Sequence, residues 1–133
     1  MEAAKVLGFD PASIRNLGWS LIDVEESGGS DSEEFTCEAG TLVIPKVSEP
    51  WRALWPLFIA IDTIITEKEP DLVVVEKTSS FAGGFVTGQV AGCIGVILAC
   101  CGKSETAVAF VPAIFACCDK GCFILCTEPP ILN

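Results

Sequence analysis

Short apolar runs separated by polar turns occupy the first third of the chain. Residues 5–10 predict a strand that ends at a turn containing Asp10 and Pro11. Partial alternation over 18–24 and a further apolar run over 35–44 predict two more strands, with a polar loop over 27–32 between them. We interpret the three strands as an antiparallel meander.

The pattern then changes to helical spacing. Ser48 is the predicted N-cap, and Pro56 is expected to kink the helix or to shift its start. The helix is predicted to end at Glu69-Pro70. The residues expected on its buried face are Trp51, Leu54, Trp55, Phe58, Ile61 and Ile65.

The next segment, 71–76, is apolar up to Glu76 and contains three consecutive valines, which is typical of a buried strand with parallel neighbours. A polar loop over 78–84, a helix over 85–101 with a face of small residues, and a strand over 106–111 are expected to follow. This order predicts an α/β domain with a mixed five-stranded sheet, an antiparallel meander followed by parallel strands, flanked by helices.

One acid ends each of two apolar strands: Asp10 ends the first, and Glu76 ends the valine-rich one. Two carboxylates side by side repel each other unless a cation lies between them, and a divalent metal held in this way can drive phosphodiester hydrolysis. Taken alone, Asp10 is better interpreted as an ordinary turn aspartate that caps backbone amides. Glu76 has no such local role, so the pair favours the metal interpretation.

The charge balance argues against strong nonspecific binding to nucleic acids. The chain has 8 basic and 18 acidic residues, a formal net charge of −10, whereas such binding depends on clustered Lys and Arg. Six acids fall between positions 23 and 34, in a stretch rich in Gly and Ser that we interpret as a solvated loop. The rest of the chain still carries −4.

Eight cysteines and no histidine are present. A mixed Cys/His zinc site is therefore impossible, and the paired Cys-x2-Cys hooks of a four-cysteine site are absent. We interpret the cysteines as small buried apolar residues, with a soft-metal or redox role as the alternative. No signal peptide is visible, and the longest apolar run, 90–101, is short for a membrane span, so we predict a cytoplasmic (intracellular) protein of one domain, 1–133.

Three motifs resemble those of the RuvC family of Holliday junction resolvases, in the RNase H-like superfamily. Residues 8–13 read Gly-Phe-Asp-Pro-Ala-Ser and 16–19 read Asn-Leu-Gly-Trp, which resembles the family's first-strand motif. Residues 74–76, Val-Val-Glu, resemble the second acidic motif, and 87–92, Thr-Gly-Gln-Val-Ala-Gly, resemble the start of the helix after it. The resemblance covers 4–111, and the cysteine-rich tail, 112–133, is atypical.

The resemblance implies a homodimeric, metal-dependent endonuclease that cuts four-way DNA junctions with two Mg²⁺ ions (or Mn²⁺) held by four carboxylates. Asp10 and Glu76 match the first two ligands, and the helix around 85–101 matches the dimerisation helix. Phe81 and Phe85 lie where such enzymes reach toward the junction. The candidate DNA-binding residues are Arg15, Lys77, Ser79, Ser80, Phe81 and Gln89.

The last two acids of the family pattern have no match. The chain continues 57 residues beyond Glu76, and its only acids after Glu105 are Asp119 and Glu128. A truncated or frame-altered reading frame and a naturally diverged tail are both consistent with this. Because two carboxylates alone bind Mg²⁺ weakly, we expect impaired or absent cleavage.

Several alternatives stay open. The fold without its active site would serve as a non-catalytic dimerisation or DNA-binding module. An actin- or sugar-kinase-like nucleotide-binding protein would need a phosphate loop and a second domain, which 133 residues do not supply together. Arg15 and Lys77 are equally solvated charges, and the three tryptophans, Trp19, Trp51 and Trp55, are interpreted as packing residues rather than a base-stacking surface.

Overall fold

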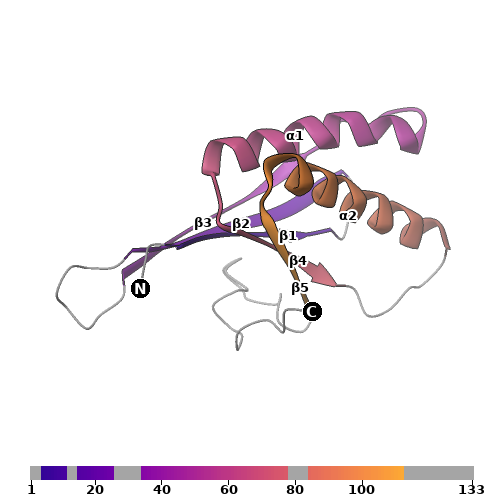
Figure 1. Cartoon of the computed structure of the whole chain (residues 1–133). Helices are drawn as coiled ribbons and strands as arrows, with labels where there is room; N and C mark the ends of the chain where they lie inside the picture. Colours follow the sequence, from indigo (N-terminus) through magenta and orange to yellow (C-terminus); the bar gives the residue numbers. More distant parts are fainter. Residues whose placement is uncertain (1–3, 12–14, 26–33, 78–83, 113–133) are drawn as a thin grey trace.

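A mixed sheet of five strands, in the order β3-β2-β1-β4-β5, forms the centre of the molecule (Figure 1). The structure, a computed structural model, describes residues 4–11, 15–25, 34–77 and 84–112. The first three strands pair antiparallel, whereas β4 pairs parallel with β1 and with β5. The predicted α/β class, with a mixed five-stranded sheet made of an antiparallel meander followed by parallel strands, is therefore confirmed. The strands are β1 (Ala4–Asp10), β2 (Asn16–Glu25), β3 (Glu34–Val43), β4 (Leu72–Lys77) and β5 (Ala107–Pro112).

Two α-helices, α1 (Leu54–Lys68) and α2 (Gly84–Ser104), cover the same face of the sheet (Figure 1). The two helices pack side by side, as two contacts between α2 and α1 show. Lys103 Nζ lies 3.1 Å from Asp62 Oδ1, and Cys100 Sγ lies 3.7 Å from the Phe58 carbonyl oxygen. α2 is the crossover that parallel pairing of β4 and β5 requires. Among the described residues no helix is both long and apolar enough to cross a membrane.

The main core lies between the two helices and the sheet. Alternate residues of β1 and β4 point into it, namely Leu7 and Phe9, and Val73 and Val75, and all four are fully buried. The helices contribute Leu57, Ile61, Ile64, Ile65, Cys93, Ile97, Cys100 and Cys101. The three cysteines of α2 are reduced and buried, so their interpretation as small apolar residues is confirmed.

The start of α1 differs from the prediction. A short 3-10 helix, η1 (Pro50–Ala53), comes first, and its N-cap is Glu49, so the expectation that Ser48 caps the helix is wrong. Pro56 lies in the first turn of α1, where its missing amide hydrogen removes no intrahelical bond. The proline therefore shifts the start of the helix.

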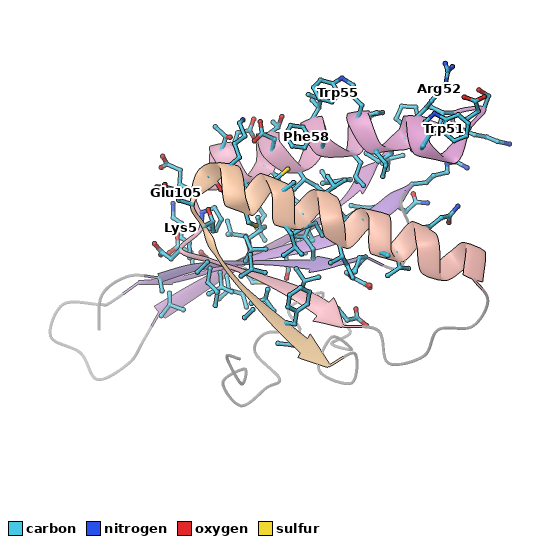
Figure 2. All side chains as sticks on the ribbon, turned by 45° about the vertical axis from the view of Figure 1, so that its right-hand side comes forward. Lys5, Trp51, Arg52, Trp55, Phe58 and Glu105 are labelled. Carbon is cyan, nitrogen blue, oxygen red and sulfur yellow. The ribbon has the colours of Figure 1, made fainter. Side chains whose placement is uncertain are left out.

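Two of the three tryptophans do not pack in the core. Trp51 and Trp55 are 65% and 68% exposed, and Figure 2 shows them on the outer side of η1 and α1. Their interpretation as packing residues is wrong, although the Trp55 ring stacks on Phe58 with centroids 5.6 Å apart. Apolar residues occur on nearly every side of this helix, and the sheet takes the face carrying Leu57 and Ile61.

Trp19 is a packing residue, as predicted. Its indole lies against the core and directly over Gly40 of β3, where an added Cβ would come within 2.9 Å of the ring. Lys68, the last residue of α1, lies with its Nζ 5.9 Å from the centroid of the indole and 3.0 Å from Glu38 Oε2. Through Lys68, the C-terminal end of α1 thus contacts Trp19 of β2 and Glu38 of β3.

Candidate metal centre

Asp10 and Glu76 lie next to each other on neighbouring strands. β1 and β4 run parallel with Phe9 opposite Val75, so the following residue of each strand is an acid. Asp10 is the last residue of β1, and Glu76 is the last but one of β4. Both side chains are partly exposed. The structure thus brings together the two acids that the sequence singles out.

The acid pair belongs to the sheet face opposite the helices. Phe9 and Val75 point into the helical core, and side chains alternate along a strand, so Asp10 and Glu76 point the other way. A second, smaller apolar cluster occupies that face beside them. Its members are Val6, Leu72, Val74 and Val111.

The closeness of the two carboxylates has a direct electrostatic consequence. The pKa of Glu76 rises from 4.5 to about 7. Partial burial contributes most to this increase, followed by a side-chain hydrogen bond to Asp10 and by repulsion from the charge of Asp10. At neutral pH Glu76 is therefore protonated for part of the time. A cation bound between the two carboxylates would relieve the same repulsion that this proton relieves.

The charge of Asp10 also reaches α2. Burial raises the pKa of the Cys93 thiol to about 12, and the negative charge of Asp10 contributes to that increase. Cys93 is fully buried and carries no charge at physiological pH. α2 therefore brings no positive group to the acids at this position, and the thiol is unsuited to bind a metal.

The donor set suits a hard divalent cation. Carboxylate oxygens are the ligands preferred by Mg²⁺ and Mn²⁺, and the chain has no histidine to favour zinc or copper. Within the described residues, no group of three or more His, Cys, Asp or Glu side chains is placed to hold a metal. Within the described part of the chain, the site thus consists of the two neighbouring carboxylates of Asp10 and Glu76. Asp119, the next acid considered from the sequence, lies outside the described residues.

Sequence reasoning missed Ser20 of β2. Its side chain is fully buried, and its Oγ has no hydrogen-bond partner among the described residues. Ser20 pairs with Gly8, and Gly18 pairs with Asp10, so Ser20 lies on the same sheet face as the acids and one step along from Asp10. The only signal in the sequence is a hydroxyl residue between two large apolar neighbours, Trp19 and Leu21.

The predicted DNA-binding residues are spread over several elements. Arg15 is exposed just before β2, and its carbonyl oxygen accepts a hydrogen bond from the Ile44 amide at 2.8 Å. Lys77 ends β4 directly after Glu76, and Gln89 is partly exposed in the N-terminal half of α2. Phe85 falls in the first turn of α2. Ser79, Ser80 and Phe81 lie outside the described residues.

Comparison with known proteins yields matches among solved structures. No protein-family model matches the sequence, and no curated protein does. RuvC of Thermus thermophilus superposes with a TM-score of 0.67 at 16% identity, over 81% of this chain and 63% of that one. T. thermophilus RuvC in complex with a Holliday junction substrate gives 0.68 at 12% identity, over 85% and 67% of the two chains.

A third match is the yeast mitochondrial Holliday junction resolvase Ydc2, with a TM-score of 0.55 at 12% identity over 80% of this chain and 52% of that one. The chain thus spans less than two thirds of the first of these RuvC structures and about half of Ydc2. At such identities the likeness concerns the fold. The chain has the RNase H-like fold of RuvC, with strand order 3-2-1-4-5 and two helices on one face of the sheet.

Proposed function

We propose that this chain is a metal-dependent endodeoxyribonuclease that acts on four-way DNA junctions. One observation carries the proposal: the neighbouring carboxylates of Asp10 and Glu76, at the ends of two parallel strands of a RuvC-like fold. One of the solved structures with this fold holds a Holliday junction substrate. Low identity to these proteins makes the acid pair, rather than the likeness, the main support.

Asp10 and Glu76 would hold Mg²⁺ or Mn²⁺, which activates water and stabilises the leaving oxygen in phosphodiester hydrolysis. Each carboxylate contributes an oxygen ligand, and the negative pair attracts the ion to the sheet face opposite the helices. Glu76 must release its proton before it binds the ion, and its pKa of about 7 makes metal and proton compete near neutral pH. Metal affinity should therefore increase as the pH rises through this value.

Homodimerisation through α2 is part of the proposal. The outward side of this helix carries no charge between Gln89 and Lys103. Its exposed residues there are Ala91, Gly95, Leu98, Ala99 and Gly102, of which Leu98 is 40% exposed. A smooth, uncharged helix face lets a second helix approach closely. Two copies would present two metal sites, one for each strand that is cut.

We propose that Arg15, Lys77 and Gln89, with Ser79, Ser80 and Phe81, contact the junction. With a net charge of −10, the chain has few cations to neutralise phosphates, so binding should rest on a small number of contacts. The affinity for DNA should accordingly fall only gently as salt is raised.

A second candidate function is a non-catalytic dimerisation or DNA-binding module. It is favoured by the absence, within the described residues, of any group of three or more side chains able to hold a metal. Two carboxylates bind Mg²⁺ weakly, so cleavage by the described acids alone should be slow. The two functions share the fold and differ in whether the acid pair acts on DNA.

The deciding experiment is cleavage of a labelled synthetic four-way junction with Mg²⁺ or Mn²⁺. The endonuclease function predicts slow, symmetrical nicks from the wild-type chain and none from Asp10→Asn. Asp23→Asn, which makes the same change at a distant position of β2, should nick at the wild-type rate. Binding of the junction is measured in parallel by gel shift. Binding without nicks would establish the non-catalytic module, and neither binding nor nicks would overturn both functions.

A further inference from the structure

The buried hydroxyl of Ser20 is a structural anomaly near the acid pair. Ser20 is 0% exposed, and its Oγ has no partner within the described residues. A buried polar atom without a hydrogen bond is rare in folded proteins, because its lost hydration is not replaced. Alanine would fill the same position in β2 without this cost, so the hydroxyl requires an explanation.

The strand register places Ser20 beside the acids. On the face opposite the helices, Ser20 stands next to Gly8 of β1, and Asp10 follows Gly8 on that face. Gly8 has no side chain, so no side chain stands between the hydroxyl and the side chain of Asp10 along this diagonal. Diagonal neighbours across an antiparallel pair lie about 7 Å apart at Cβ, which is the reach of a hydrogen bond through one water molecule.

A hydrated divalent cation would provide that water. Mg²⁺ takes octahedral coordination and usually keeps several of its water molecules, all the more so where two carboxylates are its protein ligands. Each of those waters has hydrogens to donate, and a hydroxyl that accepts one fixes the orientation of the hydrated ion. Ser20 has an unused hydroxyl on the correct face of the sheet.

We propose that Ser20 is a positioning residue of the metal centre, whose hydroxyl binds a water of the ion's hydration shell and orients it against the Asp10 carboxylate. The inference rests on the proposed metal site at Asp10 and Glu76 and adds to it an outer-sphere partner. It also accounts for the unpartnered atom, because the hydroxyl gains its hydrogen bond when the hydrated ion is bound. The role differs from that of a ligand, since Ser20 acts through water.

The test is titration of the full chain with Mn²⁺, with free Mn²⁺ followed by electron paramagnetic resonance, together with the melting temperature of the metal-free protein. Loss of an outer-sphere partner typically weakens metal binding about 10- to 100-fold, and we expect Ser20→Ala to do so. The same variant should melt at the wild-type temperature or higher without metal, because it removes an unpartnered buried group. Ser20→Thr, which keeps the hydroxyl, should restore affinity.

Ser104→Ala is the matched control. Ser104 Oγ lies 3.1 Å from the Cys100 carbonyl oxygen at the far end of α2, so this variant should lower the melting temperature and leave Mn²⁺ affinity unchanged. Ser20→Cys, close to serine in shape, repeats the test should the alanine variant fail to fold. Wild-type affinity in folded Ser20→Ala, with binding lost in Asp10→Asn, would overturn the role of Ser20 and leave the metal centre standing. Absence of Mn²⁺ binding by the wild-type chain would overturn both.

Discussion

Replacement of Glu76 by glutamine should make the metal-free protein more stable at high pH, and only there. In the folded chain the pKa of Glu76 is raised from 4.5 to about 7, chiefly by burial and then by Asp10. Such an increase corresponds to about 3 kcal/mol of unfavourable free energy when the carboxyl is ionised. Because Glu76 is partly exposed, solvent screens the interaction, and we expect about 1–2 kcal/mol in practice.

The sign of the effect follows from proton linkage. Below the unfolded pKa of 4.5, Glu76 is protonated in both the folded and the unfolded chain, and no penalty exists. As the pH rises from 4.5 to about 7, the unfolded chain releases the proton first, so the wild-type protein loses stability across this window. Glutamine does not ionise and does not lose this free energy.

The assay is urea denaturation in the presence of a chelator, followed by tryptophan fluorescence at about pH 4 and about pH 8. The free energy of unfolding of Glu76→Gln, relative to wild type, should increase by about 1–2 kcal/mol between the two conditions. Glu67→Gln, the same substitution on the exposed side of α1, is the control for general effects of charge. An unchanged difference between Glu76→Gln and wild type across the pH range would refute the raised pKa of Glu76.

Four further changes test the packing by urea denaturation. Gly40→Ala should destabilise the fold by about 1–3 kcal/mol, because the new Cβ would lie 2.9 Å from the Trp19 ring, whereas Gly95→Ala, with nothing within 4 Å, should stabilise it by about 0.5–1 kcal/mol. Glu69→Gly should stabilise by about 1 kcal/mol, since Glu69 ends α1 with a φ of 48°, a conformation that glycine adopts without strain; no gain would contradict this. Trp55→Ala should cost no more than about 1.5 kcal/mol, the value of its ring stacking, and a larger loss would mean that this exposed side chain packs more extensively than described.

The sequence was sufficient to predict most of the fold. The first strands partly alternate apolar and polar residues, and the run before Glu76 is rich in valine. These patterns fit one arrangement, because a strand that is apolar along its whole length needs a neighbouring strand on each side. The two acids follow from the same pattern, since parallel strands place their ends together. The sequence does not predict which face of η1 and α1 is buried. Trp51, Trp55 and Leu57 are all apolar, and which of them is buried depends on how the helix packs on the sheet.

Ser20 shows a different limit of sequence reasoning. A serine between apolar residues of a strand is ordinary, and its significance depends on whether another residue satisfies its hydroxyl. That information is three-dimensional, since Ser20 faces Gly8 through the register of β1 and β2. The helix start shows the same limit, because the 3-10 turn before Leu54 depends on how the chain leaves β3 as much as on Ser48 or Pro56.

The parallel pairing of β1 with β4 sets the order in which the acid pair is assembled during folding. Asp10 and Glu76 are separated along the chain by β2, β3 and α1, so no local segment brings them together. Closure of this long loop costs chain entropy before any contact compensates for it, and such contacts form late and slowly. The repulsion between the two acids cannot arise before β4 has paired with β1. We therefore expect a divalent cation to slow the unfolding of the finished protein rather than to speed its folding.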